Sequence, residues 1–296
     1  MRLRTALLAL SLGLATGCQA TLFGTLGVAG RAHGVETRQG IMFDSAHKLA
    51  LDVYRPANVR NAPVVVFFYG GTWKEGQRSW YRFVGEALSK RGLVVVIPDY
   101  RKYPEVRFPA FVEDAANATR WARDHATDYG GDVHAFFVMG HSAGAHIGAL
   151  LATDARYLNA VDMKPRDLAG FIGLAGPYDF APITDADLIP IFGSTLAEQQ
   201  AAQPVNHVDG DESAMLLLHG QSDTTVWPSN SKALDRRLQD AGESEQLKLY
   251  PGIGHTKILL SLSPLLSDWS PALDDTLRFI SAHGGNAPVP DLRTTR

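Results

Sequence analysis

The sequence predicts an α/β fold with a mostly parallel central sheet and helices on both of its faces. Two observations predict it: short apolar runs bounded by Gly, Pro or Asp recur along the chain, and segments with helical periodicity lie between them. Runs of this kind are typical of strands buried on both faces of a parallel sheet. Strands that alternate with helices require right-handed crossovers and therefore parallel pairing. We expect residues 34–284 to form one domain of this class.

The first predicted strand is HKLALDVYRP at 47–56, in which Leu49, Leu51 and Val53 occupy alternate positions. This alternation predicts a strand that is exposed on one face. Six continuous apolar runs follow, and each predicts a strand buried on both faces. In chain order they are APVVVFFYG (62–70), GLVVVIPDY (92–100), HAFFVMGHS (134–142), LAGFIGLAGP (168–177), AMLLLHG (214–220) and QLKLYPG (246–252).

The clearest predicted helix runs onward from Phe108. Apolar and small residues recur there at helical spacing, at Phe108, Phe111, Val112, Ala115, Thr119 and Ala122. The opposite face carries Glu113, Asp114, Arg120 and Arg123. A helix with one apolar and one polar face is expected to pack on the sheet through its apolar side.

Two regions interrupt the alternation of strands and helices. Residues 178–212 are rich in Asp, Pro, Ala and Gln, and we expect them to form a cap-like insertion over the carboxyl edge of the sheet. Residues 285–296 have no apolar period and are expected to form a disordered tail.

The N-terminus has the features of a secretory signal. Two arginines precede an apolar run from Ala6 to Ala15, and small residues lead to Cys18. The segment LATGC resembles the lipobox of bacterial lipoproteins, which implies removal of residues 1–17 and acylation of Cys18. Residues 18–33 would link this anchor to the domain. Two or three acyl chains, at about 0.8 kcal/mol for each buried CH2, imply lasting membrane attachment. By the same resemblance, Gln19 implies the outer membrane of a bacterial envelope, with the protein facing the periplasm.

The composition argues against a nucleic-acid-binding protein and excludes a fold held together by disulfides within the chain. The chain has 28 Lys and Arg against 31 Asp and Glu, which gives a formal net charge of -3, and it has no basic stripe. Nucleic acid is therefore not an expected partner. Cys18 is the only cysteine, which excludes a disulfide within one chain.

The pentapeptide GHSAG at 140–144 follows an apolar strand and precedes a segment of small residues. A G-x-S-x-G pattern in this context is typical of a nucleophile elbow, a strand-to-helix turn so sharp that its flanking residues must be small. Such a turn would expose the Ser142 hydroxyl over the end of the sheet. The N-terminus of the following helix would favour the negative charge that develops there.

A serine nucleophile needs a general base and a carboxylate that orients the base. Asp223 lies a few residues after the run that ends at 220, and His255 follows the next run. Both are therefore expected at the carboxyl edge of the sheet, beside Ser142. His207 is a weaker rival for the base, and His219 is expected to be structural. The other nearby acids precede their strand and would lie at its opposite end; they are Asp209, Asp211 and Glu212.

The stretch YGGTW at 69–73 directly follows an apolar strand. Its glycines would let the backbone approach the reacting carbon, with the N–H groups of Gly71 and Thr72 turned inward. The backbone N–H of Ala143 would be a third donor to the oxyanion of the tetrahedral intermediate. Loss of one such donor costs about 3 to 4 kcal/mol in the barrier.

Five segments are spread over residues 62–256: YGGTW, IPDYRKYPEVRFPAFVEDA, DYGGDVHAFFVMGHSAGAH, HGQSDTTV and GIGH. In this order they resemble the α/β-hydrolases of the carboxylesterase group that carry an H-G-G-x-W loop, which includes hormone-sensitive-lipase-like esterases, isoprenylcysteine methylesterases and kynurenine formamidases. The resemblance implies an α/β-hydrolase fold with Ser142 as nucleophile, Asp223 as acid, His255 as base, and Gly71, Thr72 and Ala143 as oxyanion donors. It also implies that DYR at 99–101 braces the oxyanion loop. Tyr69 stands where this family usually has His.

The expected reaction is hydrolysis of a carboxylic ester through an acyl-enzyme, without a metal or organic cofactor. Trp73, Trp80 and Phe192 are expected to line an apolar pocket, which favours short or medium acyl chains or an aromatic ester. An arylformamidase would use the same triad and is the alternative enzyme. A catalytically inactive, membrane-tethered binding protein is the alternative from a different class, and the intact triad argues against it.

Overall fold

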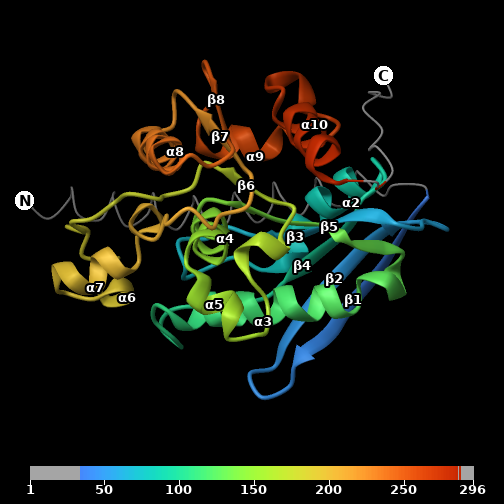
Figure 1. Ribbon diagram of the computed structural model, residues 1–296, viewed down its shortest axis with the longest axis horizontal. Helices are drawn as coiled ribbons and strands as arrows, with labels where there is room; N and C mark the ends of the chain where they lie inside the picture. The colour runs from blue at the N-terminus through green and yellow to red at the C-terminus, as the bar shows by residue number, and fades with distance from the viewer. Residues whose placement is uncertain (1–33, 286, 288–296) are drawn as a thin grey trace, which may run out of the picture.

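The computed structural model of the protein describes residues 34–285 and 287 (Figure 1). The predicted signal peptide, Cys18, the predicted linker up to residue 33 and nearly all of the predicted tail lie outside the described residues. Within the described part of the chain, no helix has the length and apolar character needed to cross a bilayer.

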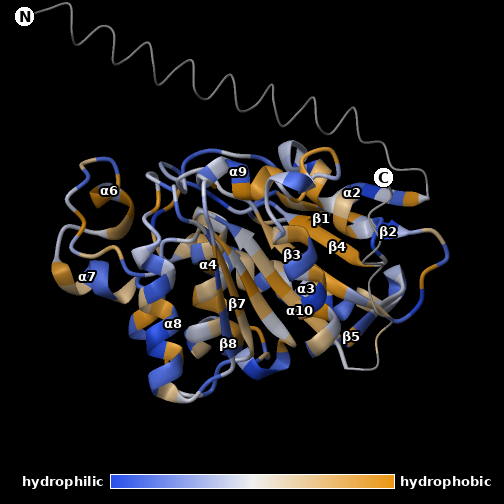
Figure 2. Cartoon of the chain, turned by 90° about the horizontal axis from the view of Figure 1, so that it is seen from above, coloured by the Kyte–Doolittle hydropathy of each residue, from blue (hydrophilic) through white to orange (hydrophobic). Residues whose placement is uncertain are grey.

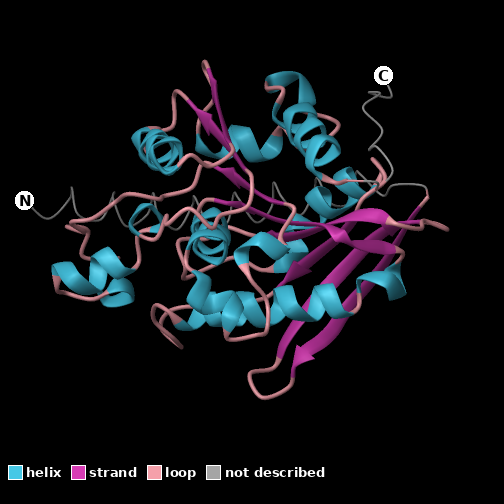
Figure 3. Ribbon diagram, in the orientation of Figure 1, coloured by secondary structure: helices cyan, strands magenta, loops and turns pink. Residues whose placement is uncertain are grey.

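The described residues build one eight-stranded sheet with the strand order β1-β2-β4-β3-β5-β6-β7-β8. Figure 3 shows its strands with helices packed around them. The pairs β1·β2 and β2·β4 are antiparallel, and all the other neighbouring pairs are parallel. The predicted α/β fold with a mostly parallel sheet is confirmed. The strands are β1 (Val35–Asp44), β2 (Leu49–Pro56), β3 (Ala62–Phe68), β4 (Val94–Pro98), β5 (Gly131–His141), β6 (Gly170–Leu174), β7 (Met215–Gly220) and β8 (Glu245–Tyr250).

Helices cover both faces of this sheet, with α2 and α10 on one side and α3 and α4 on the other (Figure 1). The helices are α2 (Arg82–Ser89), α3 (Ala110–Asp124), α4 (Ala143–Thr153), α5 (Ala155–Asn159), α6 (Ile189–Phe192), α7 (Leu196–Ala201), α8 (Ser229–Ala241), α9 (His255–Leu260) and α10 (Ala272–His283). Figure 2 shows apolar residues concentrated in the strands and polar residues on the outer surfaces of helices such as α8. The core therefore lies between the sheet and its two helical layers.

The prediction that the strand at 47–56 is exposed on one face is wrong. In β2, every residue from Leu49 to Tyr54 is buried. Helix α2 packs against this strand at Gly85, where an added Cβ would meet the ring of Tyr54. The polar Asp52 is buried because its carboxylate accepts a hydrogen bond from the Arg78 Nε at 2.9 Å.

The two edges of the sheet also differ from the prediction. The run at 246–252 forms β8, which is an edge strand with Gln246 and Lys248 exposed, because only β7 pairs with it. The strand at the other edge, β1, was not predicted. Its register with β2 shifts at two places, so its sequence has no regular two-residue period.

The predicted helix after Phe108 is confirmed as α3, although it begins only at Ala110, after Pro109. Its predicted apolar face is buried. Asp114, predicted on the polar face, is buried as well, because its carboxylate pairs with the Arg101 guanidinium, with Nη2 2.7 Å from Oδ1. A buried carboxylate needs such a partner.

The segment at 178–212 connects β6 to β7 and contains α6, α7 and the short 3-10 turn η4 (Pro204–Asn206). The rings of Phe180 and Phe192 in this segment contact the ring of Trp73, which follows β3. The segment therefore lies beside the loop at the carboxyl end of β3.

Candidate active site

Ser142 occupies the sharp turn between β5 and α4, with φ of 55° and ψ of −124°. A positive φ is strained for a residue that carries a side chain. Small neighbours make the turn possible. A Cβ at Gly140 would overlap the Gly144 carbonyl, and a Cβ at Gly144 would overlap the Phe68 carbonyl at the end of β3. The sequence GHSAG therefore folds into the elbow geometry that its pattern predicts.

The structure brings Ser142, His255 and Asp223 together from the ends of three strands. The His255 Nε2 lies 2.9 Å from the Ser142 Oγ, and the His255 Nδ1 lies 2.8 Å from the Asp223 Oδ2. Because a carboxylate only accepts hydrogen bonds, Nδ1 carries the ring proton and donates it to Asp223. Nε2 is then free to accept the Ser142 hydroxyl proton. This arrangement can activate a serine nucleophile.

Asp223 is buried, with only 2% of its surface exposed. Its Oδ1 accepts hydrogen bonds from the backbone N–H groups of Thr225 and Val226, both 2.9 Å long. Burial alone would raise the pKa of this carboxyl, but the hydrogen bonds from His219 and His255 outweigh it and hold the pKa below its ordinary value. Asp223 is therefore ionised at neutral pH and can stabilise a protonated His255.

His219, predicted to be structural, lies next to this carboxylate. Its Nε2 is 3.3 Å from the Asp223 Oδ2 and 2.9 Å from the carbonyl oxygen of Val226. Its Nδ1 is 2.7 Å from the hydroxyl of Ser231. The ring thus supports the loop that carries the acid.

His141, directly before the nucleophile, contacts the base, and sequence reasoning did not single it out. Its Nε2 donates to the backbone carbonyl of His255 at 3.1 Å, and the two rings lie 4.8 Å apart. Burial, reinforced by repulsion from His255, lowers the pKa of His141 to about 3. The ring is therefore neutral and holds the residue that begins α9. Only the GHSAG pattern itself could have drawn attention to this side chain.

The loop after β3 lies against the nucleophile, since a Cβ at Gly70 would be 3.0 Å from the Ser142 Cβ. Gly71 has φ of 138°, and Thr72 and Trp73 each have φ of 55°. The Gly71 carbonyl accepts from Lys74 and Glu75 N–H groups, which closes the turn. Within the described residues, no hydrogen bond uses the N–H of Gly71 or Thr72. The third predicted donor is the N–H of Ala143. It has no acceptor within α4, because Ala143 is the first residue of that helix.

Tyr69 anchors the start of this loop. Its buried phenol donates to the Asp99 Oδ1 and accepts from the Lys102 Nζ, and both distances are 3.1 Å. The Tyr100 hydroxyl donates to the Tyr69 carbonyl at 2.8 Å, and the Tyr81 hydroxyl donates to the next carbonyl along the loop at 3.2 Å. The rings of Tyr81 and Tyr100 both stack on Tyr69. Asp99 and Tyr100 of the DYR segment therefore contact the loop, with a phenol in place of an imidazole, whereas Arg101 pairs with Asp114 on α3.

Two of the three predicted pocket residues, Trp73 and Phe192, meet in one aromatic cluster. Their ring centroids lie 4.7 Å apart in an edge-to-face contact, and Phe180 and His146 complete the cluster. Trp73 is 4% and Phe192 2% exposed, so the cluster is closely packed. Trp80 is half-buried in η1 (Arg78–Tyr81), and no ring contact within the described residues joins it to the cluster.

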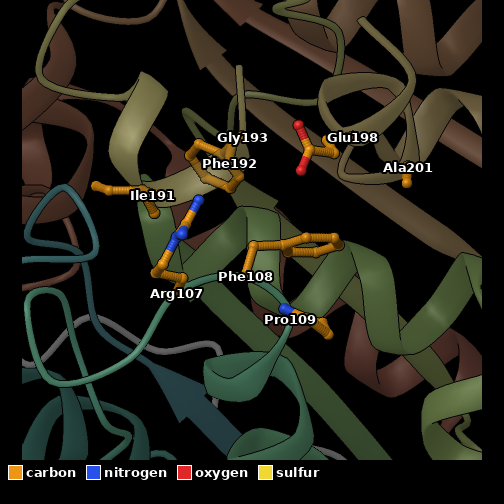
Figure 4. A pocket seen from close by; sticks show the side chains of 8 residues that line it. All are labelled: Arg107, Phe108, Pro109, Ile191, Phe192, Gly193, Glu198 and Ala201. Carbon is orange, nitrogen blue, oxygen red and sulfur yellow. The ribbon is translucent and has the colours of Figure 1, made fainter. Parts of the chain in front are cut away.

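Phe192 also borders a pocket of about 420 Å3 between α6, α7 and the start of α3 (Figure 4). Its walls are mainly apolar, with one guanidinium and one carboxylate. The lining residues are Arg107, Phe108, Pro109, Ile191, Phe192, Gly193, Glu198 and Ala201.

The alternative candidates for the base and the acid lie away from Ser142. His207 contacts the Ala201 carbonyl and lies 3.6 Å from the Asp154 carboxylate, not beside the nucleophile. Asp211 pairs with Arg166, and Glu212 accepts backbone hydrogen bonds in the turn before β7. The described residues contain no group of three His, Cys, Asp or Glu side chains suited to hold a metal ion.

Comparisons with known proteins agree with this fold. A structure described as a truncated form of a carbohydrate esterase from gut microbiota superposes with a TM-score of 0.73 and 21% identity, over 84% of this chain and 96% of that chain. Esterase B from Lactobacillus rhamnosis superposes with a TM-score of 0.75 and 21% identity, over 93% and 95% of the two chains. The fold is that of an α/β-hydrolase, as the sequence predicts, with Ser142, His255 and Asp223 at the carboxyl edge of its sheet.

Residues 51–238, which are more than half of the chain, match the model of the BD-FAE family. The chain belongs to the BD-FAE family. It is 29% identical over 277 residues to isoprenylcysteine alpha-carbonyl methylesterase ICME of Arabidopsis thaliana, and this match covers 86% of this chain and 65% of that protein. It is 28% identical over 216 residues to esterase LipQ of Mycobacterium tuberculosis, over 65% of this chain and 50% of that protein. The matches thus span between half and about two thirds of these relatives.

Proposed function

We propose that the protein hydrolyses carboxylic esters through an acyl-enzyme. Ser142 Oγ attacks the ester carbonyl carbon while His255 Nε2 takes the hydroxyl proton. The Asp223 carboxylate stabilises the imidazolium, which then gives the proton to the departing alcohol. Water, activated by the same imidazole, cleaves the acyl-serine and releases the acid. The oxyanion formed in each half-reaction would accept hydrogen bonds from the N–H groups of Gly71, Thr72 and Ala143.

One observation carries the proposal. An unbroken hydrogen-bonded chain runs from the Ser142 Oγ through His255 to a buried and ionised Asp223, with spacings of 2.9 and 2.8 Å. The serine at its end is held in a strained backbone conformation directly before the N-terminus of α4. Such strain is maintained where the surrounding structure specifies it, and it is concentrated at functional sites.

The aromatic cluster supports a substrate with a short acyl chain or a compact aromatic acyl group. Trp73 directly follows the predicted oxyanion donors and is almost fully buried against Phe192 and His146. The closely packed rings of this cluster favour a short acyl chain. The names of the two curated relatives, a methylesterase and an esterase, agree with ester hydrolysis.

The test measures turnover by the protein lacking residues 1–18 on a panel of substrates. The panel contains p-nitrophenyl esters of increasing acyl length and N-formylkynurenine. We expect the acetyl or butyryl ester to be turned over fastest. Faster turnover of the formamide would favour an arylformamidase with the same triad. Absence of turnover on every compound, from a folded sample, would favour an inactive binding protein and would contradict the proposal.

The proposal extends to the location of the enzyme, which rests on the N-terminal sequence alone. Acylation of Cys18 after removal of residues 1–17 would tether the domain to a bacterial membrane. Expression of the full chain in a Gram-negative host with a clickable fatty acid tests this. We expect label on the wild-type protein in the outer-membrane fraction and none on Cys18→Ala. Equal labelling of both proteins, or of neither, would contradict the tether.

A further inference from the structure

His146 lies one helical turn after the nucleophile on α4, and its ring makes two hydrogen bonds to other parts of the fold. The Trp73 Nε1 lies 3.3 Å from the His146 Nδ1, and the His146 Nε2 lies 2.8 Å from the carbonyl oxygen of Ala202. The backbone N–H of His146 bonds the Ser142 carbonyl at 3.1 Å. One fully buried side chain therefore touches the oxyanion loop and the 178–212 insertion from the helix that follows the nucleophile.

The two partners fix one tautomer of His146. A backbone carbonyl can only accept, so Nε2 carries the proton and donates it to Ala202. The indole N–H of Trp73 can only donate, so Nδ1 must be the unprotonated acceptor. Burial lowers the pKa of His146 to about 4, which keeps the ring neutral at physiological pH. The neutral ring with one donor and one acceptor matches both neighbours.

The residues held in this way are strained. Thr72 and Trp73 both have φ of 55°, and neither is a glycine. A non-glycine residue in the left-handed region is strained and keeps that conformation only where its surroundings hold it. Relaxation of the two residues would turn the N–H of Thr72, one of the proposed oxyanion donors. The hydrogen bond to His146 and the edge-to-face contact of the two rings, with centroids 5.1 Å apart, oppose that relaxation.

We propose that His146 is a positioning residue: it fixes the Trp73 indole, and through it the strained Thr72–Trp73 segment, to the nucleophile helix and to the insertion. This inference rests on the proposed ester hydrolysis and adds a residue outside the triad to it. His146 touches no reacting atom. It acts by keeping the N–H of Thr72 aimed at the oxyanion.

Three single variants and one double variant test the inference by ester kinetics. His146→Leu removes both hydrogen bonds, His146→Gln replaces them with an amide that can accept from Trp73 and donate to Ala202, and Trp73→Phe removes only the indole donor. We expect His146→Leu to lower kcat by roughly 10- to 100-fold with little change in KM, since a misplaced donor costs part of the 10²- to 10³-fold effect of a missing one. His146→Gln should recover most of kcat. The double variant His146→Leu with Trp73→Phe should be no worse than the worse single variant.

His125→Leu is the matched control, because His125 stacks on Trp121 at the end of α3, away from the site, with centroids 4.1 Å apart. It should leave kcat unchanged. A kcat of His146→Leu within about twofold of wild type would overturn the inference, as would equal losses in the Leu and Gln variants or additive effects with Trp73→Phe. The rate of fluorophosphonate labelling separates this failure from failure of the proposed function. If wild type is labelled at Ser142 while His146→Leu is labelled equally fast, only the positioning role is wrong.

Discussion

Tyr69→Phe removes one hydroxyl from the anchor of the oxyanion loop and leaves the ring in place. The lost hydroxyl makes two charge-assisted hydrogen bonds, to Asp99 and from Lys102. Each charged partner keeps another contact, since Asp99 also pairs with Arg78 and the Lys102 Nζ also bonds the Tyr100 carbonyl at 3.0 Å. Neither charge is therefore left unpaired. At about 1.5 kcal/mol for each hydrogen bond to a charged group, the free energy of unfolding should fall by about 2 to 3 kcal/mol.

The catalytic effect of Tyr69→Phe should be smaller. The phenols of Tyr81 and Tyr100 still hold the two carbonyls at the start of the loop, and both rings still stack on residue 69. We therefore expect kcat on p-nitrophenyl acetate to fall less than about tenfold, well below the 10²- to 10³-fold loss of a missing oxyanion donor. Tyr69→His should likewise lower kcat on p-nitrophenyl acetate less than about tenfold.

Urea unfolding and steady-state kinetics on the same samples measure both effects. Tyr250→Phe is the matched control, because its hydroxyl donates to the Asp275 carboxylate at 2.7 Å on α10. It should lose stability and keep kcat. A loss of kcat of about 100-fold or more in folded Tyr69→Phe would show that the phenol has a catalytic role of its own, since that is the effect of losing a donor. Unchanged stability would show that the two hydrogen bonds contribute nothing.

Two further variants probe the oxyanion loop and the acid, and the pH dependence of stability probes the buried histidines. Gly71→Ala should lower kcat by at least about 100-fold, because φ of 138° suits only glycine and a Cβ would overlap the Glu75 carbonyl; activity within tenfold of wild type would contradict this. Asp223→Asn should lower kcat by on the order of 10³ to 10⁴ with KM nearly unchanged, because the amide disfavours the tautomer that accepts the serine proton; steady-state kinetics decides. The pKa values of about 3 for His141 and about 4 for His146 lie below the ordinary 6.5, so the unfolded chain binds more protons between these values. The free energy of unfolding should therefore fall as the pH falls from about 6.5 to about 4, and urea titrations that give a pH-independent stability in this range would contradict it.

Local pattern predicted most of the fold and the core of the site. The GHSAG turn could be read from its glycines, since each is needed for close packing at the elbow. Asp223 and His255 could be predicted because residues after parallel strands meet at one edge of a sheet. The strand β1 could not, because its bulges remove the two-residue period. The burial of Asp52 in β2 depends on Arg78, which no periodicity indicates.

The contacts around the triad were missed for a related reason. His141 meets the backbone of a residue 114 positions away, and His146 lies between residues 73 positions before it and 56 positions after it. Such side-chain partners depend on how the loops pack over the sheet edge, which the order of strands does not specify. For the same reason Trp80, grouped with Trp73 by residue type, lies outside the aromatic cluster.

The proposed hydrolysis requires Ser142 to be a nucleophile activated by His255 and Asp223. Intact-mass spectrometry with peptide mapping, after reaction with a fluorophosphonate, tests it most directly on wild type and on Ser142→Ala. We expect one adduct on wild type, located at Ser142, and no adduct on the folded variant, whose ester turnover should fall by on the order of 10⁴ to 10⁶. A folded wild-type protein that is not labelled, or is labelled at another residue, would contradict the proposed role of Ser142.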